Sequence, residues 1–335
     1  MVRPGPRNLI TDVAGLRVGH AEDHKVLSGT TVLVADTPFL AVADLRGGAP
    51  GSREIDVLDP INLVGHADAI VLSGGSVHGL DAASAVVAAL RAKDRGYRMS
   101  TLAPSAPIVP AAVLFDLANG GDKEWGEESP YRALGHAAFA AASESFVLGN
   151  TGAGLGARAG IYKGGLGSAS AMTDDDFMVG ALAAVNSVGS PLIPNTNVFW
   201  AFPFEQNGEF GGRPFKDQPS GELDLPSDMK VADPGANTTI AIVAVDAEVT
   251  AVELKRIAVM AADGFARALR PVHTPFDGDI VFAVTTGRRP LGEPRSRALM
   301  RLGSIASDCL SRAIARGVYE ARSVGTMASY REFFP

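Results

Sequence analysis

The sequence has one cysteine, no long apolar run and fewer basic than acidic residues. With Cys309 alone, no disulfide can form within the chain, and its apolar helical surroundings are typical of a small buried side chain. No stretch is long enough to span a bilayer, and the first residues lack the apolar core of a secretion signal, so we expect a soluble cytoplasmic protein without a membrane partner. The net charge of −7 argues against nucleic acid as the main partner.

The length and composition favour one large folded domain. Of the 335 residues, 46% are hydrophobic and 20% are charged, which supplies enough apolar material for a core. We therefore expect residues 1–335 to form a single catalytic domain, because layered folds of helices and sheets reach this size.

Hydrophobic periodicity predicts a layered α/β (α+β) fold. Apolar, β-branched runs predict strands at Thr31–Ala35, Ala69–Leu72, Ser145–Leu148, Gly180–Val185, Thr239–Val245 and Ile280–Thr285. Helical spacing of apolar residues predicts helices at Leu80–Lys93, Tyr131–Ala142, Val252–Leu269 and Ser296–Arg316. Pairs of strands separate most helices, which fits an αββα sandwich at least as well as an alternating parallel sheet.

The segment Phe204–Gly235 is polar, rich in Gly, Pro and Asp, and almost without periodicity. A loop of this length in a compact protein is usually functional or disordered. A buried strand follows abruptly at ANTTIAIVAVDA. The junction has the pattern expected of a processing site, and also that of an ordinary loop before a core strand.

The junction contains Asn237-Thr238-Thr239. A threonine hydroxyl is a weak nucleophile until a base removes its proton. If Thr238 became an N-terminus, its own α-amine, with a pKa of about 7.7–8.0, would be that base. A threonine pair at the head of a strand is equally consistent with ordinary sheet structure.

Three further patterns are candidates for chemistry. Asp277-Gly278-Asp279 places two carboxylates before a strand, where they can orient an amine, hold a cation or form a turn. The glycine-rich run Asn150–Gly167 lacks the Gly-Lys-Ser/Thr of a phosphate loop, so we expect no nucleotide cofactor, and Lys163 is either a cation near a reacting group or a loop lysine. Residues 73–76 (SGGS) fit a helix cap or an anion site but not a nucleophile elbow.

The histidines do not form a metal motif. Only His20 and His24 have i, i+4 spacing, and no metalloprotease glutamate lies beside them. We therefore expect no bound metal. The six histidines are His20, His24, His66, His78, His136 and His273.

Taken together, motifs along nearly the whole chain resemble the autoprocessing aminopeptidase and amidohydrolase family. This family includes the L-aminopeptidase/D-amino-acid esterases, the β-peptidyl aminopeptidases and the nylon-oligomer endohydrolases. The matching motifs are ITDVAGLRVGH (10–20), RGGAPGSRE (46–54), SGGSVHGLDAA (73–83), VPAAVLFDL (109–117), YKGGLGSAS (162–170), AVNSVG (184–189), NTTI (237–240) and PFDGDIVFA (275–283).

The resemblance implies an αββα fold akin to that of N-terminal-nucleophile hydrolases. It also implies self-cleavage into an α-chain of residues 1–237 and a β-chain of residues 238–335. By motif, Thr238 is then the nucleophile, Asn186 the side-chain donor to the oxyanion and Lys163 the lysine near the nucleophile. Asp277 and Asp279 would orient the Thr238 amine. The expected substrates are small peptides or amides, and the expected assembly is a homotetramer.

The sequence departs from both branches of this family. The aminopeptidase branch uses a serine nucleophile, with serine and glutamate where this chain has Asp277 and Asp279, whereas Thr238 with paired aspartates resembles the nylon-oligomer branch. Both branches have an oxyanion-assisting tyrosine where this chain has Phe115, which cannot donate a hydrogen bond. Three readings follow: a hydrolase of undetermined exo- or endo-specificity, an acyltransferase of the ornithine acetyltransferase type, or a degenerate binding protein.

Overall fold

The computed structural model describes residues 2–215, 225–230 and 237–335. Its strands are β1 (Leu16–Asp23), β2 (Ser28–Leu45), β3 (Ser52–Arg53), β4 (His66–Ser73), β5 (Ala111–Val113), β6 (Arg158–Ala159), β7 (Tyr162–Lys163), β8 (Gly165–Met172), β9 (Met178–Asn186), β10 (Thr238–Glu248) and β11 (Ile280–Pro290). Its α-helices are α1 (Asp81–Ala92), α2 (Tyr131–Ala140), α3 (Ala251–Ala261), α4 (Asp263–Ala266), α5 (Arg295–Glu320) and α6 (Tyr330–Phe333). Short 3₁₀ turns lie at Ile10–Asp12, Asp56–Leu58, Ser76–Leu80, Gly152–Gly154 and Phe202–Phe204.

Strand β2 joins two halves of one large sheet. The hydrogen-bonded order is β3-β5-β4-β2-β11-β10-β9-β8, and β1 pairs with β2 in addition. The first part of β2 pairs with β1, whereas residues 40–45 pair with β11. The register on β4 shifts between Val34 and Phe39, where the exposed stretch of β2 interrupts the ladder. This long strand therefore belongs to both halves of the sheet.

The two halves pack face to face over an inner core, to which none of the α-helices contributes a buried residue. Alternation along each strand creates this core, because successive side chains point to opposite faces. On β10, Ile240 and Ile242 point into the inner core, while Ala241 and Val243 point to the helices on the other side.

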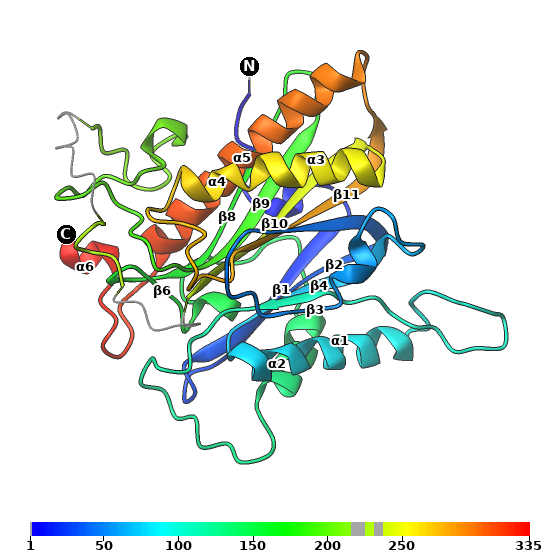
Figure 1. Ribbon diagram of the computed structural model, residues 1–335, viewed down its shortest axis with the longest axis horizontal. Helices are drawn as coiled ribbons and strands as arrows, with labels where there is room; N and C mark the ends of the chain where they lie inside the picture. The colour runs from blue at the N-terminus through cyan, green and yellow to red at the C-terminus, as the bar shows by residue number, and fades with distance from the viewer. Residues whose placement is uncertain (1, 216–224, 231–236) are drawn as a thin grey trace.

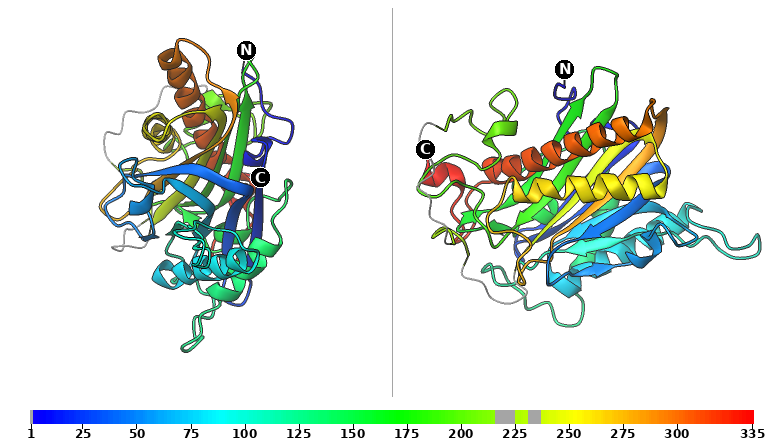
Figure 2. Two further views of the ribbon diagram at one scale, coloured as in Figure 1. Left: turned by 90° about the vertical axis from the view of Figure 1, so that its right-hand side faces the viewer. Right: turned by 45° about the horizontal axis from the view of Figure 1, so that its top comes forward.

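Helices cover both outer faces (Figure 1). Helices α1 and α2 pack on β2 and β4 through residues such as Val71, Val86 and Tyr131. Helices α3, α4 and α5 cover β9, β10 and β11 through Leu254, Phe265 and Leu310 among others. Figure 2 shows α3 and α5 lying side by side across the sheet. The predicted αββα sandwich is confirmed, with the difference that its two sheets are continuous through β2.

Most predicted elements are present. The predicted helix Val252–Leu269 is divided into α3 and α4, and a Thr250–Glu253 capping box begins α3. The predicted strand Ser145–Leu148 is wrong, because this run crosses from β1 to β8. β-Bridges occur on either side of it, from Ser143 to Val18 and from Gly149 to Leu166, and Phe146 packs against the inner core.

The predicted loop Phe204–Gly235 begins in a 3₁₀ turn, and its described residues form no strand or α-helix. Residues 216–224 and 231–235 of this prediction lie outside the described residues. No helix in the described parts of the chain is both long and apolar enough to cross a membrane.

Candidate active site

The ends of three adjacent strands bring the predicted site residues together. Thr238 opens β10 and pairs directly with Asn186, the last residue of β9. Strand β11 runs parallel to β10, so residues 277–279, which precede β11, lie at the same edge as Thr238. A bridge between Asn237 and Asp277 extends this pairing back to the predicted cleavage bond. The sheet register therefore places these separated segments side by side.

The bond between Asn237 and Thr238 is buried, with 1% and 4% of the two residues exposed. The Thr238 hydroxyl donates a hydrogen bond to the carbonyl oxygen of Asn237. The same oxygen accepts a hydrogen bond from the Gly278 N–H at 3.0 Å. The hydroxyl thus lies against the carbonyl that self-cleavage would attack, and a backbone donor already contacts the oxygen that would gain negative charge.

The two carboxylates of residues 277–279 are held by different partners. Asp277 accepts hydrogen bonds from the Val188 N–H (3.2 Å) and from the Thr274 N–H (3.0 Å) and hydroxyl (2.5 Å). Asp279 accepts from the Thr239 N–H at 2.7 Å and from His273 through both its backbone N–H (3.1 Å) and its ring Nδ1 (2.9 Å). Both side chains are buried.

Burial and proximity change the proton affinity of this pair. Removal from water raises the pKa of Asp277 above its usual value, and the negative charge of Asp279 raises it further. The hydrogen bonds from Thr274 and Val188 act in the opposite direction. The pair is thus suited to sit beside a positively charged amine, which would offset the repulsion between the two carboxylates.

Gly278 lies directly against the nucleophile candidate. A Cβ atom at this position would stand 2.8 Å from the Thr238 hydroxyl oxygen and 2.6 Å from the Ala49 carbonyl oxygen. Residues 46–49 stabilise the loop of residues 277–279, because the N–H groups of Arg46 and Ala49 donate to the carbonyls of Asp279 (2.9 Å) and Asp277 (2.8 Å). The glycine therefore provides the space in which the threonine hydroxyl sits.

Lys163 is fully buried and donates hydrogen bonds to backbone carbonyls of the glycine-rich run. Its ammonium donates to the carbonyls of Gly154 (2.9 Å), Ala157 (3.0 Å) and Gly164 (2.6 Å), which uses all three of its N–H donors. Burial lowers its pKa to about 7. Its predicted role beside the nucleophile stays a prediction.

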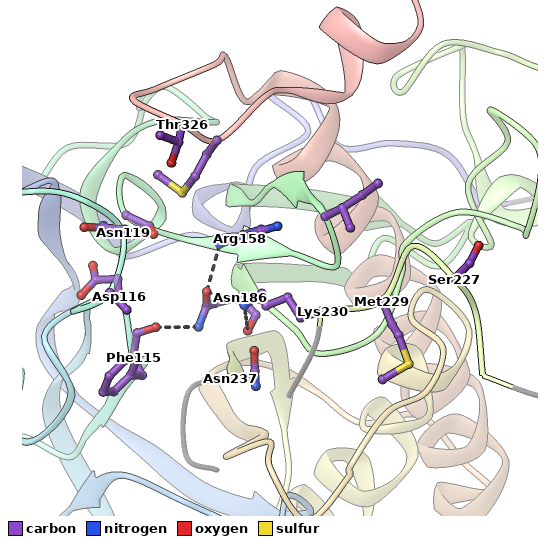
Figure 3. Close-up of a pocket in the computed structure, with 14 residues that line it drawn as sticks. Phe115, Asp116, Asn119, Arg158, Asn186, Ser227, Met229, Lys230, Asn237 and Thr326 are labelled. Carbon is purple, nitrogen blue, oxygen red and sulfur yellow. Dashed lines mark hydrogen bonds between the residues drawn. The ribbon is translucent and has the colours of Figure 1, made fainter. Parts of the chain in front are cut away.

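Asn186 is buried at the junction of several segments (Figure 3). Its Oδ1 accepts hydrogen bonds from the Arg158 N–H (2.9 Å) and the Lys230 ammonium (3.1 Å). Its Nδ2 donates to the Phe115 carbonyl at 3.0 Å. Phe115 thus contributes a backbone acceptor to the site. The Asn186 Nδ2, which is predicted to donate to the oxyanion, donates to this carbonyl in the structure.

A cavity of about 490 Å³ opens beside this junction, and we call it the acyl-side cavity because Asn237, on the acyl side of the predicted cleavage bond, is part of its wall. Phe115 and Asn186 also line it, together with the charged residues Asp116, Arg158 and Lys230. Sequence reasoning did not single out these three charged residues. Arg158 and Lys230 nevertheless lie in the two segments that it flagged, the glycine-rich run and the polar loop.

Asp116 belongs to a buried hydrogen-bond network behind the cavity. It accepts hydrogen bonds from the Ser28 hydroxyl and the Gly75 N–H, both at 2.7 Å, and Tyr131 donates to Ser28 at 3.0 Å. Burial raises the pKa of Asp116. At residues 73–76, predicted to be a helix cap or an anion site, the Gly75 N–H thus binds a carboxylate of the protein itself. Among the described residues, no group of three or more His, Cys, Asp or Glu side chains is placed to hold a metal ion.

Solved structures share this architecture. They include the L-aminopeptidase D-Ala-esterase/amidase of Ochrobactrum anthropi, described as a variant of the Ntn-hydrolase fold (TM-score 0.70, 19% identity, 98% of this chain and 93% of that chain covered). A Burkholderia sp. β-aminopeptidase also matches, with a TM-score of 0.72 at 22% identity over 98% of this chain and 91% of that chain. The fold class is therefore that of the N-terminal-nucleophile (Ntn) hydrolases.

The chain belongs to peptidase family S58, whose family model matches residues 8–331. An uncharacterized aminopeptidase of Mycobacterium tuberculosis (strain ATCC 25618 / H37Rv) is 40% identical over 98% of both chains. A 6-aminohexanoate-oligomer endohydrolase of Kocuria sp. (strain KY2) is 31% identical over 91% of this chain and 84% of that protein. The predicted family is confirmed, and membership supports peptide-bond hydrolysis.

Proposed function

We propose that the protein is an autoprocessing amide hydrolase whose nucleophile is Thr238, freed by cleavage after Asn237. The observation that carries this proposal is the contact of the Thr238 hydroxyl with the Asn237 carbonyl, beside the Gly278 N–H. The products would be an α-chain of residues 1–237 and a β-chain of residues 238–335, which stay together as one catalytic domain. Sheet pairing supports this, since β10 of the β-chain lies between β9 and β11.

In the self-cleavage step, the Thr238 Oγ1 attacks the carbonyl carbon of Asn237. The C–N bond between the two residues breaks, an ester forms, and the hydroxyl proton passes to the Thr238 nitrogen. The Gly278 N–H stabilises the oxyanion of the tetrahedral intermediate. Water then hydrolyses the ester, which leaves a carboxylate on Asn237 and a free amine on Thr238.

In each turnover, the freed Thr238 amine takes the proton of its own hydroxyl as that oxygen attacks a substrate amide. Asp277 and Asp279 orient this amine, and their negative charge favours its protonated form. Asn186 donates its Nδ2 hydrogen to the substrate oxyanion in exchange for the Phe115 carbonyl. The proton moves to the leaving amine, and water releases the acyl group from the threonine.

The substrates we propose are short peptides or other small amides. This class fits the 40% identity to a protein named as an aminopeptidase and the 31% identity to one named as an oligomer endohydrolase. Adding an amine acceptor to the assay separates hydrolysis from acyl transfer, since a transferase would yield a new amide at the expense of the free acid.

The self-cleavage proposal has a direct test. Purified wild-type protein should give two bands on a denaturing gel, with N-terminal sequencing placing the second at Thr238. Thr238→Ala should give one uncut, inactive chain, because it lacks the attacking oxygen, whereas Thr238→Ser should still cleave. Uncut wild-type protein that hydrolyses amides would refute the proposal.

We also propose that the protein forms homo-oligomers. Two loops expose large apolar side chains, with Ile61 and Leu63 88% exposed in one, and Met99 85% and Leu102 96% exposed in the other. Exposed apolar side chains that gather into a patch mark association surfaces, and each of these loops supplies two such side chains. Light scattering coupled to size exclusion should give a tetramer, and Leu63→Glu or Leu102→Glu should reduce the mass. A monomeric wild type would contradict this.

A further inference from the structure

The acyl-side cavity carries two cations on its wall, Arg158 and Lys230. No carboxylate among the described residues lies within ion-pair distance of either one. Within the same part of the chain, the Lys230 ammonium donates to Asn186, at 3.1 Å to Oδ1 and 3.4 Å to the backbone oxygen. Elsewhere in the described chain, many arginines make such pairs, for example Arg312 with Glu209 and Arg295 with Glu253. The two cavity cations therefore differ from these paired arginines.

These two basic residues meet at Asn186, because the Lys230 ammonium (3.1 Å) and the Arg158 backbone N–H (2.9 Å) both donate to its Oδ1. Burial and the charge of Arg158 lower the pKa of Lys230 to about 7, and attraction to Asp277 only partly offsets this. Placing two positive charges together without a counter-ion costs free energy, which a bound anion recovers. Arg158 is exposed, so its side chain is open to a ligand, and a bound anion would favour the charged form of Lys230.

Asp116 lines the same cavity but forms no ion pair with Arg158 or Lys230. Its Oδ2 accepts from the Ser28 hydroxyl and its Oδ1 from the Gly75 N–H, so its oxygens are engaged with the protein on the far side of the wall. The negative charge of Asp277 raises the pKa of Lys230, but this carboxylate already accepts hydrogen bonds from Thr274 and Val188.

Lys230 is held at the cavity by the segment that carries it. The Lys230 N–H donates to the Val188 carbonyl at 2.9 Å. Two residues earlier, Asp228 accepts from the hydroxyls of Tyr162 (3.1 Å) and Ser190 (2.5 Å). These contacts do not depend on the bond between Asn237 and Thr238. Lys230 therefore remains in the cavity wall after that bond is cleaved.

We infer that the acyl-side cavity binds a carboxylate between Arg158 and Lys230, and that preferred substrates carry this carboxylate on the acyl group. The inference rests on the proposed function, since the acyl side is defined by the position of Asn237. Suitable substrates are monoamides of short dicarboxylic acids. Among the small amides proposed above, those with an acidic acyl group would therefore be preferred over those whose acyl group carries an ammonium at this place.

The C-terminal carboxylate of the processed α-chain is a second source of the same chemistry, because Asn237 lines the same cavity. Substrate carboxylates and this terminus would compete for the two cations. The experiment therefore needs one arm for each source.

Three p-nitroanilides of equal acyl length test the substrate arm: succinyl, butyryl and β-alanyl. In wild-type protein, kcat/KM should be at least tenfold higher for succinyl than for butyryl, and lowest for β-alanyl. Arg158→Gln should lower the succinyl-to-butyryl ratio about tenfold, a typical loss for one charge-assisted contact. Arg256→Gln, on α3 and with no ion pair among the described residues, is the matched control and should keep the ratio.

A measurement on the wild-type protein covers the case in which Arg158→Gln fails to fold. Succinate should inhibit butyryl anilide hydrolysis more strongly than butyrate, and β-alanine least. The second arm tests whether the cations bind the C-terminal carboxylate of the α-chain. Carboxypeptidase digestion measures how fast this terminus is trimmed in the wild type and in the Arg158→Gln variant. Equal rates of trimming support the assignment of the cations to the substrate carboxylate.

The outcomes separate this inference from the proposed function. Hydrolysis of the butyryl anilide without any preference for succinyl would overturn the inference and leave the Thr238 chemistry standing. Faster trimming of the α-chain in the variant, again without a succinyl preference, would assign the cations to that terminus. An uncut chain that hydrolyses none of the anilides would remove the proposed function itself.

Discussion

The two sides of the Asn237–Thr238 bond are built differently. On the side of residues 277–279, each carboxylate oxygen accepts a hydrogen bond from a protein donor, and a Cβ at Gly278 would stand 2.8 Å from the threonine hydroxyl oxygen. On the acyl side there is a cavity of about 490 Å³, and its two cations have no carboxylate partner among the described residues. We call these the closed side and the acyl-side cavity.

This difference separates two tasks. A nucleophile needs a preorganised, water-poor environment, and the closed side supplies one through strand pairing and backbone donors. A substrate needs a space with unsatisfied groups, and the acyl-side cavity supplies one. Self-cleavage should therefore depend mainly on the closed side, and substrate choice mainly on the cavity.

The strongest test of the closed side is Gly278→Ala. The new Cβ would stand 2.8 Å from the Thr238 hydroxyl oxygen, so that the oxygen must leave the position from which it reaches Asn237. We expect self-cleavage to slow on the order of a thousandfold, about 4 kcal/mol in activation free energy. Gly292→Ala is the control, since nothing lies within 4 Å of its added Cβ. Equal cleavage rates in both variants, followed on gels over time, would refute this account.

The next largest effect concerns the stability supplied by Lys163. Lys163→Met leaves the carbonyls of Gly154, Ala157 and Gly164 without their donor. We expect the free energy of unfolding of the uncut Thr238→Ala protein to fall by about 3 kcal/mol in denaturant titrations. Lys25→Met, at a side chain that is 80% exposed, should cost under about 1 kcal/mol. Similar losses in the two variants would contradict the structural role.

The difference in the free energy of unfolding between the uncut Thr238→Ala protein and its Lys163→Met variant should depend on pH. The pKa of Lys163 is about 7 in the folded protein and about 10.4 when unfolded, so the unfolded chain binds more protons between these values. The lysine protein should therefore gain stability relative to Lys163→Met as pH rises from 7 to 10, by at most about 1.4 kcal/mol per pH unit. A difference that stays constant over this window would show that the pKa is not depressed.

The smallest expected effect is on the cavity side. Phe115 lines the acyl-side cavity next to Asn186 but has no hydrogen to donate. Phe115→Tyr adds a phenolic donor, and we expect kcat for the preferred anilide to rise about threefold, with the rate of self-cleavage unchanged. Phe115→Leu, which adds no donor, controls for the altered shape. A faster self-cleavage in the tyrosine variant would break the proposed division between the two sides.

Most of the framework is predictable from the sequence because periodicity reports burial. The inner strands β9, β10 and β11 and the helices α1, α2 and α5 coincide closely with the predicted runs. Strand β8 (GLGSASAM) was missed, since its residues have low strand propensity. Its glycines instead allow the backbone of α5 to approach, because a Cβ at Gly165 or Gly167 would collide with Gly317 or Ala313.

The sequence by itself determined the fold class, the family and the segments in which site residues would lie, because motifs and hydrophobic alternation are local properties of the chain. Only the tertiary structure decided which groups meet. The register of β10 between β9 and β11 places Thr238 beside Asn186 and Gly278. The contacts of Asp228 hold the segment that carries Lys230, whose ammonium meets the Arg158 N–H at the Asn186 Oδ1. These pairings span up to 72 positions between Arg158 and Lys230, and no local pattern encodes a distance in space across such a separation.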